Sequence, residues 1–176
     1  MLTCKATLSF PHLVEPSAFG DGEPQYTATL LFGPEAQKSP EYAALKKACA
    51  EAVKEKFGNK VDMKNIRNPF RNGDEKDYAG YKGCTYITVK SKSKPALVDE
   101  NTDRLLDLDR VFPGANVIAN VNPVAYDYLG NKGITFYLQA VQFLEGGTRL
   151  DGRPDPVAAF TPQGGGSSGL DDMPFA

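Results

Sequence analysis

The chain has 176 residues, of which 41% are hydrophobic and 24% are charged, and its formal net charge is −2 at pH 7. This length suits one domain with a substantial core and is marginal for two. No apolar run approaches the roughly 20 residues of a membrane-spanning helix, and three widely spaced cysteines exclude a disulfide framework and a zinc knuckle.

Two alternating segments near the start of the chain predict half-buried strands. Residues 2–10 alternate apolar and polar side chains, with Phe10 on the apolar side, and residues 26–32 alternate in the same way. Prolines and glycines predict a loop over residues 11–22. The only histidine, His12, falls in this loop, and without a second histidine it is expected to have no catalytic or metal-binding role.

One segment has the pattern of a long amphipathic helix. Ser39 is a favourable N-cap, Pro40 suits the first helical position, and Glu41 suits the positive end of the helix dipole. Gly58 then favours termination. Between these ends, apolar side chains recur every three or four residues, at Tyr42, Leu45, Ala48, Cys49, Ala52, Val53 and Phe57.

The segment after this helix shows no period until residue 84. Residues 59–83 are polar, basic and rich in glycine and asparagine, which predicts a long loop of the kind that is usually functional or disordered. Residues 84–92 alternate again and predict a strand, with Ile87 and Val89 on its inner side. The outer side of that strand holds an aromatic ring and two cations, Tyr86, Lys90 and Lys92.

The remaining elements are a connection and two strands. Residues 95–113 form an acidic connection that has room for a helical turn near Leu105 and Leu106. Residues 115–122 and 134–144 are predicted strands. Between them, residues 127–133 are predicted to form a hairpin tip, because glycine and asparagine there tolerate positive φ.

These elements predict a mainly β protein with one main helix. Five strands and a helix fit a small OB-like barrel, and a β-sandwich is the competing architecture, since the strand order cannot be read from the sequence. We predict a domain over residues 1–152. Residues 153–176 are predicted to be a flexible Gly/Ser/Pro linker and an acidic tail.

Charge is distributed unevenly along the chain. Residues 56–94 hold ten bases and four acids, a net charge of +6, whereas residues 95–176 hold five bases and eleven acids, a net charge of −6. Single-strand binding needs cations for the phosphates and exposed aromatic faces for the bases, and the basic segment interleaves both. The predicted DNA-binding residues are Arg67, Phe70, Arg71, Tyr78, Tyr81, Lys82, Tyr86, Lys90, Lys92 and Lys94, together with Tyr126 and Tyr128 beside the hairpin tip.

Each of these residues also has a purely structural interpretation. Phe70, Tyr78 and Tyr81 could pin the long loop to the core, since buried aromatics are the commoner case. The lysines Lys90, Lys92 and Lys94 could instead protect a strand edge from pairing.

The end of the chain resembles the tails of bacterial and phage single-stranded DNA-binding proteins. Those tails are flexible linkers closed by aspartates, an apolar residue and a terminal Pro-Phe, which dock partner proteins. The matching residues here are Asp171, Asp172, Met173, Pro174 and Phe175. This chain departs from the pattern at Ala176, which moves the terminal carboxylate one residue beyond the phenylalanine.

The body resembles a family of tailed-phage single-stranded DNA-binding proteins with an OB-like fold. The resemblance is carried by residues 7–13, 26–28, 120–126, 130–133 and 136–142. It implies binding of single-stranded DNA without sequence specificity during phage replication or recombination, with recruitment of replication or recombination proteins through the tail. It also implies a location in the cytoplasm of an infected bacterial host, in agreement with an N-terminus that lacks a signal-peptide pattern.

Two other functions remain open at this point. One is a phage structural or adaptor protein that docks a partner and never touches DNA. The other is a metal-dependent nuclease using carboxylates of the 95–113 connection, which is disfavoured because these acids cluster in one loop. We therefore expect no enzyme activity, no cofactor, no metal site and no membrane association, with weak duplex DNA binding as an additional expectation.

Overall fold

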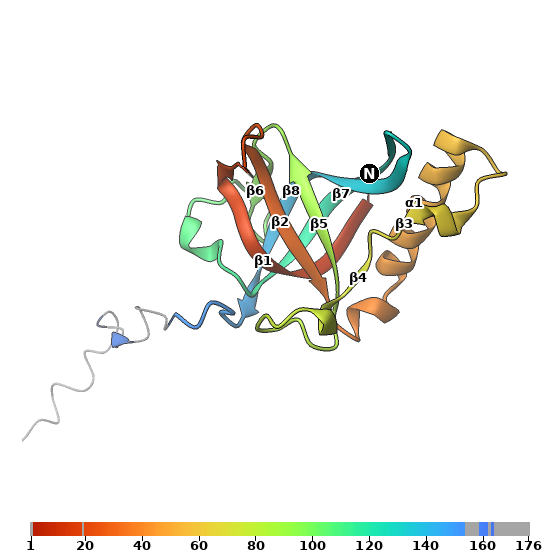
Figure 1. The fold of residues 1–176 in the computed structure, drawn as a ribbon. Coiled ribbons are helices and arrows are strands. Elements are labelled where there is room, and N and C mark those ends of the chain that lie inside the picture. Colours follow the sequence, from red (N-terminus) through yellow and green to blue (C-terminus); the bar gives the residue numbers. More distant parts are fainter. Residues whose placement is uncertain (1, 19, 154–158, 162, 164–176) are drawn as a thin grey trace, which may run out of the picture.

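The computed structural model describes residues 2–18, 20–153, 159–161 and 163 (Figure 1). The long strands are β1 (Leu2–Ser17), β2 (Gln25–Phe32), β5 (Thr85–Ser91), β7 (Ala115–Tyr128) and β8 (Asn131–Gly147). The short strands are β3 (Ile66–Arg67), β4 (Arg71–Asn72) and β6 (Ala96–Val98). The helix α1 spans Pro40–Phe57, and short 3-10 turns lie at Ala36–Lys38, Met63–Asn65, Gly73–Glu75 and Leu108–Arg110.

The five long strands close into a barrel. β1 pairs antiparallel with both β2 and β7, β2 pairs with β5, and β7 pairs with β8. A parallel pairing of β5 with β8, which matches Val89 with Phe136, closes the circle. The predicted OB-like barrel of five strands and one helix is confirmed, and the sandwich alternative is wrong.

Alternate residues of these strands fill the barrel interior. Leu30, Ile87, Val89 and Val117 have no exposed surface, and they pack with aromatic rings such as Phe136 from the strand that closes the barrel. The predicted inner side of residues 84–92 is therefore confirmed. Its outer side faces away from the core, so a ligand can approach β5 only from that side.

Helix α1 has the predicted ends. The Ser39 side chain accepts a hydrogen bond from the Tyr42 amide at 3.2 Å, and Gly58 follows the last turn with a positive φ of 83°. Of the predicted apolar stripe, Tyr42, Leu45, Cys49 and Val53 are buried. The helix packs against β1 and β7 and lies at one side of the barrel (Figure 1).

The predicted limits of the first strand are wrong, because β1 continues through the expected loop to Ser17. Residues 2–7 pair with β7, and residues from Thr7 onward pair with β2, so the prolines of the extension lie where β1 has one paired neighbour and remove no hydrogen bond to a second. The pairing register shifts between Ser9 and His12, a β-bulge that turns Phe10 away from the core. His12 thus lies in a strand.

The predicted loop 59–83 lacks long elements but contains β3, β4 and two 3-10 turns. It is fixed where Gly73 donates its amide hydrogen to the Cys84 carbonyl at 2.8 Å. A Cβ atom on Gly73 would lie 2.2 Å from the Tyr81 carbonyl oxygen, so only glycine permits this close approach. The segment is therefore an ordered excursion along the barrel wall.

The acidic connection differs from its prediction in two respects. The helical turn forms at Leu108–Arg110, where the Asp107 carboxylate accepts from the Asp109 amide at 3.1 Å, while Leu105 packs into the core. The connection also holds β6, which pairs with β8 beyond the end of β5. The predicted hairpin tip is confirmed at Leu129 and Gly130, which both have positive φ.

Two further predictions concern the cysteines and membranes. Cys4 and Cys49 are buried as expected, and burial raises the pKa of each thiol to about 12. Cys84 is half-buried, and none of the three forms a disulfide. No helix within the described residues is long and apolar enough to span a membrane.

Candidate nucleic-acid interface

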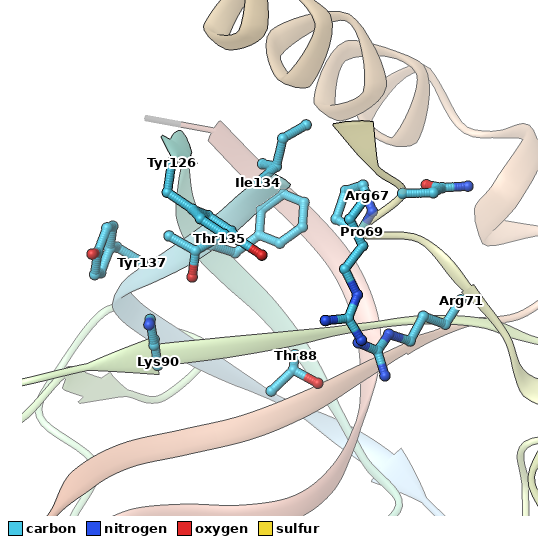
Figure 2. A pocket seen from close by; sticks show the side chains of 11 residues that line it. Arg67, Pro69, Arg71, Thr88, Lys90, Tyr126, Ile134, Thr135 and Tyr137 are labelled. Atoms are coloured by element: carbon cyan, nitrogen blue, oxygen red, sulfur yellow. The ribbon is translucent and has the colours of Figure 1, made fainter. Parts of the chain in front are cut away.

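A groove of about 380 Å³ lies over the parallel junction of β5 and β8 (Figure 2). The wall opposite this junction is formed by the excursion between α1 and β5. The lining residues are Arg67, Asn68, Pro69, Arg71, Thr88, Lys90, Tyr126, Ile134, Thr135, Phe136 and Tyr137.

Three cations converge on this groove. Figure 2 shows Arg67 and Arg71 extending from the excursion toward β5, and Lys90 extending from β5 toward Tyr137. No carboxylate is among the lining residues, and the ion pairs found in the described part of the chain involve other residues. Cations gathered without carboxylates create a positive potential that favours a polyanion.

Two short strand pairings hold the arginines in place. β3 joins the excursion to β8 by matching Arg67 with Gly133, and β4 joins it to β5 by matching Arg71 with Tyr86. The segment between them therefore bridges the two barrel strands that meet at the groove. The guanidinium groups are positioned by backbone hydrogen bonding, which favours a preformed site.

The groove also contains aromatic rings. The Lys90 ammonium lies 5.9 Å from the centroid of the Tyr137 ring, so a cation and a π-face sit together on the outer surface. Tyr126 lies opposite Gly133, where an added Cβ would come 2.6 Å from the tyrosine hydroxyl oxygen. The absence of a side chain at Gly133 thus allows the Tyr126 ring to lie against β8.

Two predicted DNA-binding tyrosines lie elsewhere, and their prediction as exposed stacking surfaces is wrong. Tyr81 is 2% exposed and Tyr86 is 7% exposed, and both pack with Leu31 in a small cluster on the outer surface of the barrel. The Tyr81 hydroxyl donates to the Ser9 Oγ at 3.0 Å, and burial raises its pKa. Tyr86 does project from the predicted face of β5, but Tyr81 covers it.

The other predicted residues are dispersed. Phe70 packs between Tyr42 and Phe136, with ring centroids 5.5 and 5.9 Å away, and lines a neighbouring cleft beside α1. Lys94 lines a separate cleft near Leu106. The rest are exposed outside the groove: Tyr78 and Lys82 on the excursion, Lys92 just beyond β5, and Tyr128 at the hairpin.

Sequence reasoning therefore identified four groove residues, Arg67, Arg71, Lys90 and Tyr126. It missed Asn68, Pro69, Thr88, Ile134, Thr135, Phe136 and Tyr137. A signal for Tyr137 existed, because it alternates with the apolar Phe136 and Leu138 and must point outward. Its proximity to Lys90 depends on the parallel pairing of β5 with β8, which no local pattern encodes.

Carboxylates of the acidic connection bind partners within the same connection. Asp99 accepts hydrogen bonds from the Asn101 and Asp103 amides at 2.9 and 3.0 Å. Glu100 pairs with Arg110, whose guanidinium lowers the pKa of that carboxyl. Within the described residues no three metal-ligating side chains come together. The predicted docking residues 171–175 lie outside the described residues.

Comparisons with known proteins match this chain to phage proteins. A family model described as Enterobacter phage Enc34, ssDNA-binding protein, matches residues 1–170. Protein p50 of Acyrthosiphon pisum secondary endosymbiont phage 1 is 35% identical over 156 residues, covering 82% of this chain and 83% of that protein.

Solved structures share the fold. The bacteriophage Enc34 single-stranded DNA-binding protein in complex with ssDNA superposes with a TM-score of 0.62 at 22% identity, covering 86% of each chain. The single-stranded DNA-binding protein encoded by bacteriophage T7 superposes with a TM-score of 0.55 at 16% identity, covering 88% of this chain and 96% of that one. At these identities the structural similarity establishes the fold.

Proposed function

The chain belongs to the family of the Enterobacter phage Enc34 single-stranded DNA-binding protein, and from this premise we propose that it binds single-stranded DNA through the groove between β5 and β8. The observation that carries the assignment to this groove is the convergence of Arg67, Arg71 and Lys90, without a carboxylate, beside the ring of Tyr137. Phosphates would contact the cations and unpaired bases would stack on the aromatic ring. OB-folds bind oligonucleotides on the face of their second and third strands and in the bordering loops, and β5, the third long strand of this barrel, forms one side of the groove.

The proposed binding has little sequence preference. Every base has a π-face, so stacking tolerates any base, and a cation that contacts a phosphate reads no base edge. In this proposal the protein coats single-stranded DNA during phage replication or recombination, in the cytoplasm of an infected bacterium. It performs no chemical step, because coating a strand requires neither bond formation nor bond cleavage.

Titration of the full chain with labelled oligo-dT at several salt concentrations tests this proposal. For single strands the logarithm of the binding constant falls by about 0.7 per tenfold rise in salt for each phosphate neutralised. If the three groove cations each contact a phosphate, the slope should be about −2. Oligonucleotides of mixed sequence should bind with similar affinity.

Three other outcomes would contradict the proposal. No binding at low salt favours an adaptor protein that docks partners without touching DNA. A salt slope near zero means that phosphate contacts do not hold the DNA. Degradation of the oligonucleotide in the presence of magnesium or manganese indicates a nuclease.

We also propose that the DNA-binding domain ends near residue 152. Leu150 packs against the cluster of Leu31, Tyr81 and Tyr86, and its amide donates to the Pro113 carbonyl at 2.8 Å. The sequence beyond residue 153 is rich in proline, glycine and serine and ends in Asp171-Asp172-Met173-Pro174-Phe175-Ala176. Such a composition fits a flexible linker that carries a partner-docking peptide.

Truncation after Phe160 should leave the thermal midpoint nearly unchanged and raise DNA affinity. The removed segment carries Asp171, Asp172 and the terminal carboxylate, which can compete with phosphates for the basic groove. The gain should be largest for weakly bound duplex DNA and should shrink as salt rises. Parallel titrations of both proteins with oligo-dT and with duplex DNA measure it.

The variant Phe175→Ala separates the two proposed roles of the tail. It removes the aromatic anchor for a partner pocket and keeps both aspartates, so replication or recombination proteins should no longer be captured while competition with DNA persists. Equal DNA affinity with and without the tail at low salt rules out competition. A partner that binds Phe175→Ala as tightly as the parent protein rules out the docking role.

A further inference from the structure

Phe10 is an exposed aromatic residue held in an unusual backbone conformation. Strict alternation along β1 would place it inward, after the outward-facing Ser9, but the bulge before His12 turns it to the surface. Its φ is +44° and its side chain is 51% exposed. A bulky residue at positive φ is a genuine outlier, and such strain persists only where surrounding structure enforces it.

The neighbouring excursion places a second exposed ring against Phe10. The Tyr78 ring meets Phe10 edge to face, with centroids 5.2 Å apart, and Tyr78 is 50% exposed. Tyr81 lies beneath this pair, with its ring centroid 5.2 Å from Tyr78 and 6.5 Å from Phe10. Because Tyr81 is buried and bonded to Ser9, the two outer rings form a supported aromatic surface.

This aromatic pair lies two strands away from the groove around the barrel wall. Ser9 on β1 pairs with Thr29 on β2, and Thr29 pairs with Thr88 on β5, which lines the groove. All three side chains face outward. Phe10 is therefore displaced from Thr88 by two strand spacings, or about 10 Å. Ser9 is buried beneath Tyr81, and the half-buried Thr29 lies between the aromatic pair and Thr88.

We propose that Phe10 and Tyr78 form a second stacking site for an unpaired base, at the β1 end of a DNA path that begins in the groove. This inference rests on the proposed function and extends its path across β2. The path is favoured because Thr29, the β2 residue between Thr88 and the aromatic pair, is small and half-buried and leaves room for the DNA backbone. Since neither ring carries a charge, the second site should add affinity without adding salt dependence.

The variant Phe10→Gly tests the site without unfolding the protein. Glycine tolerates positive φ, so the substitution relieves backbone strain while removing the ring, and the thermal midpoint should not fall. Binding of an oligo-dT of about 16 nucleotides, the upper OB-fold site size, should weaken about 5- to 150-fold, the equivalent of 1–3 kcal/mol. Binding of an oligo-dT of about 4 nucleotides, the lower site size, should change by less than about twofold.

Two matched variants complete the test. Phe10→Tyr keeps the stacking face and should bind the long oligonucleotide like the parent protein. Leu129→Gly removes another exposed apolar side chain at positive φ, in the β7–β8 turn, and should also bind normally.

The possible failures are distinguishable. If the parent protein binds neither oligonucleotide, the proposed function fails and this inference fails with it. If the parent binds both and Phe10→Gly binds the long one equally well, only the second stacking site is overturned, and the aromatic pair serves a protein partner or a second copy of the chain. A changed salt slope in Phe10→Gly also contradicts the inference, because no charge is removed.

Discussion

Replacing Arg67, Arg71 and Lys90 together by alanine should remove most oligo-dT binding at low salt. Hydrogen bonds to charged groups contribute about 1.5 kcal/mol or more each, so the three losses amount to roughly a 10³-fold weaker affinity if they add. The salt slope should become less steep by about 2, since three phosphate contacts disappear at about 0.7 each. Fluorescence titration over a salt series measures both quantities.

The triple variant Lys82→Ala, Lys92→Ala and Lys94→Ala is its matched control. It removes the same number of positive charges from the same basic segment, but these side chains lie outside the groove. The loss of long-range electrostatic attraction alone should weaken its DNA binding only modestly, and this effect should vanish at high salt. Equal losses in the two triple variants would mean that the net charge of the segment matters and that the groove does not.

Local sequence patterns were sufficient to predict the elements that depend on neighbouring residues. The limits of α1 follow from Ser39 and Gly58, and the inner side of β5 follows from the alternation of Ile87 and Val89. The β7–β8 turn follows from the need for positive φ at its tip. Each signal lies within a few residues of the structure it determines, so it can be read without knowing the fold.

The groove could not be assembled from such patterns. The charge of residues 56–94 indicated the correct region, but only strand pairing decides which of its cations converge. Tyr137 was missed because it lies outside the basic segment and reaches Lys90 through the parallel junction of β5 and β8. The orientation of Tyr86 was correct and its exposure was not, since a loop residue, Tyr81, covers it.

The exposure of Phe10 illustrates the same limit. Alternation predicts a buried ring, and one extra residue in the β1 bulge reverses the direction of its side chain. The bulge is a property of the pairing between β1 and β2.

The substitution Tyr81→Ala should lower the free energy of unfolding by about 3–5 kcal/mol, the usual cost of truncating a buried aromatic side chain. The Tyr81 ring packs against Tyr86, with centroids 5.3 Å apart, and connects the excursion to the outer surface of β1 through Ser9. Its loss should also weaken oligo-dT binding, because the same excursion carries Arg71 into the groove and Tyr78 against Phe10. Urea unfolding followed by circular dichroism, together with the salt-series titration, measures both effects.

Two single substitutions separate packing from hydrogen bonding in this anchor. Tyr81→Phe keeps the ring and removes the hydrogen bond to Ser9, so the expected loss is about 1 kcal/mol with DNA binding preserved. Tyr78→Ala, on the same excursion but half exposed, should cost at most about 1 kcal/mol of stability. It should weaken the binding of long oligonucleotides, because it removes one ring of the proposed stacking pair.

An unfolding midpoint for Tyr81→Ala equal to that of the parent would show that the buried ring does not fix the excursion. In that case another contact of the excursion would have to position Arg71 and Tyr78. The close approach of Gly73 to the Tyr81 carbonyl oxygen is such a contact.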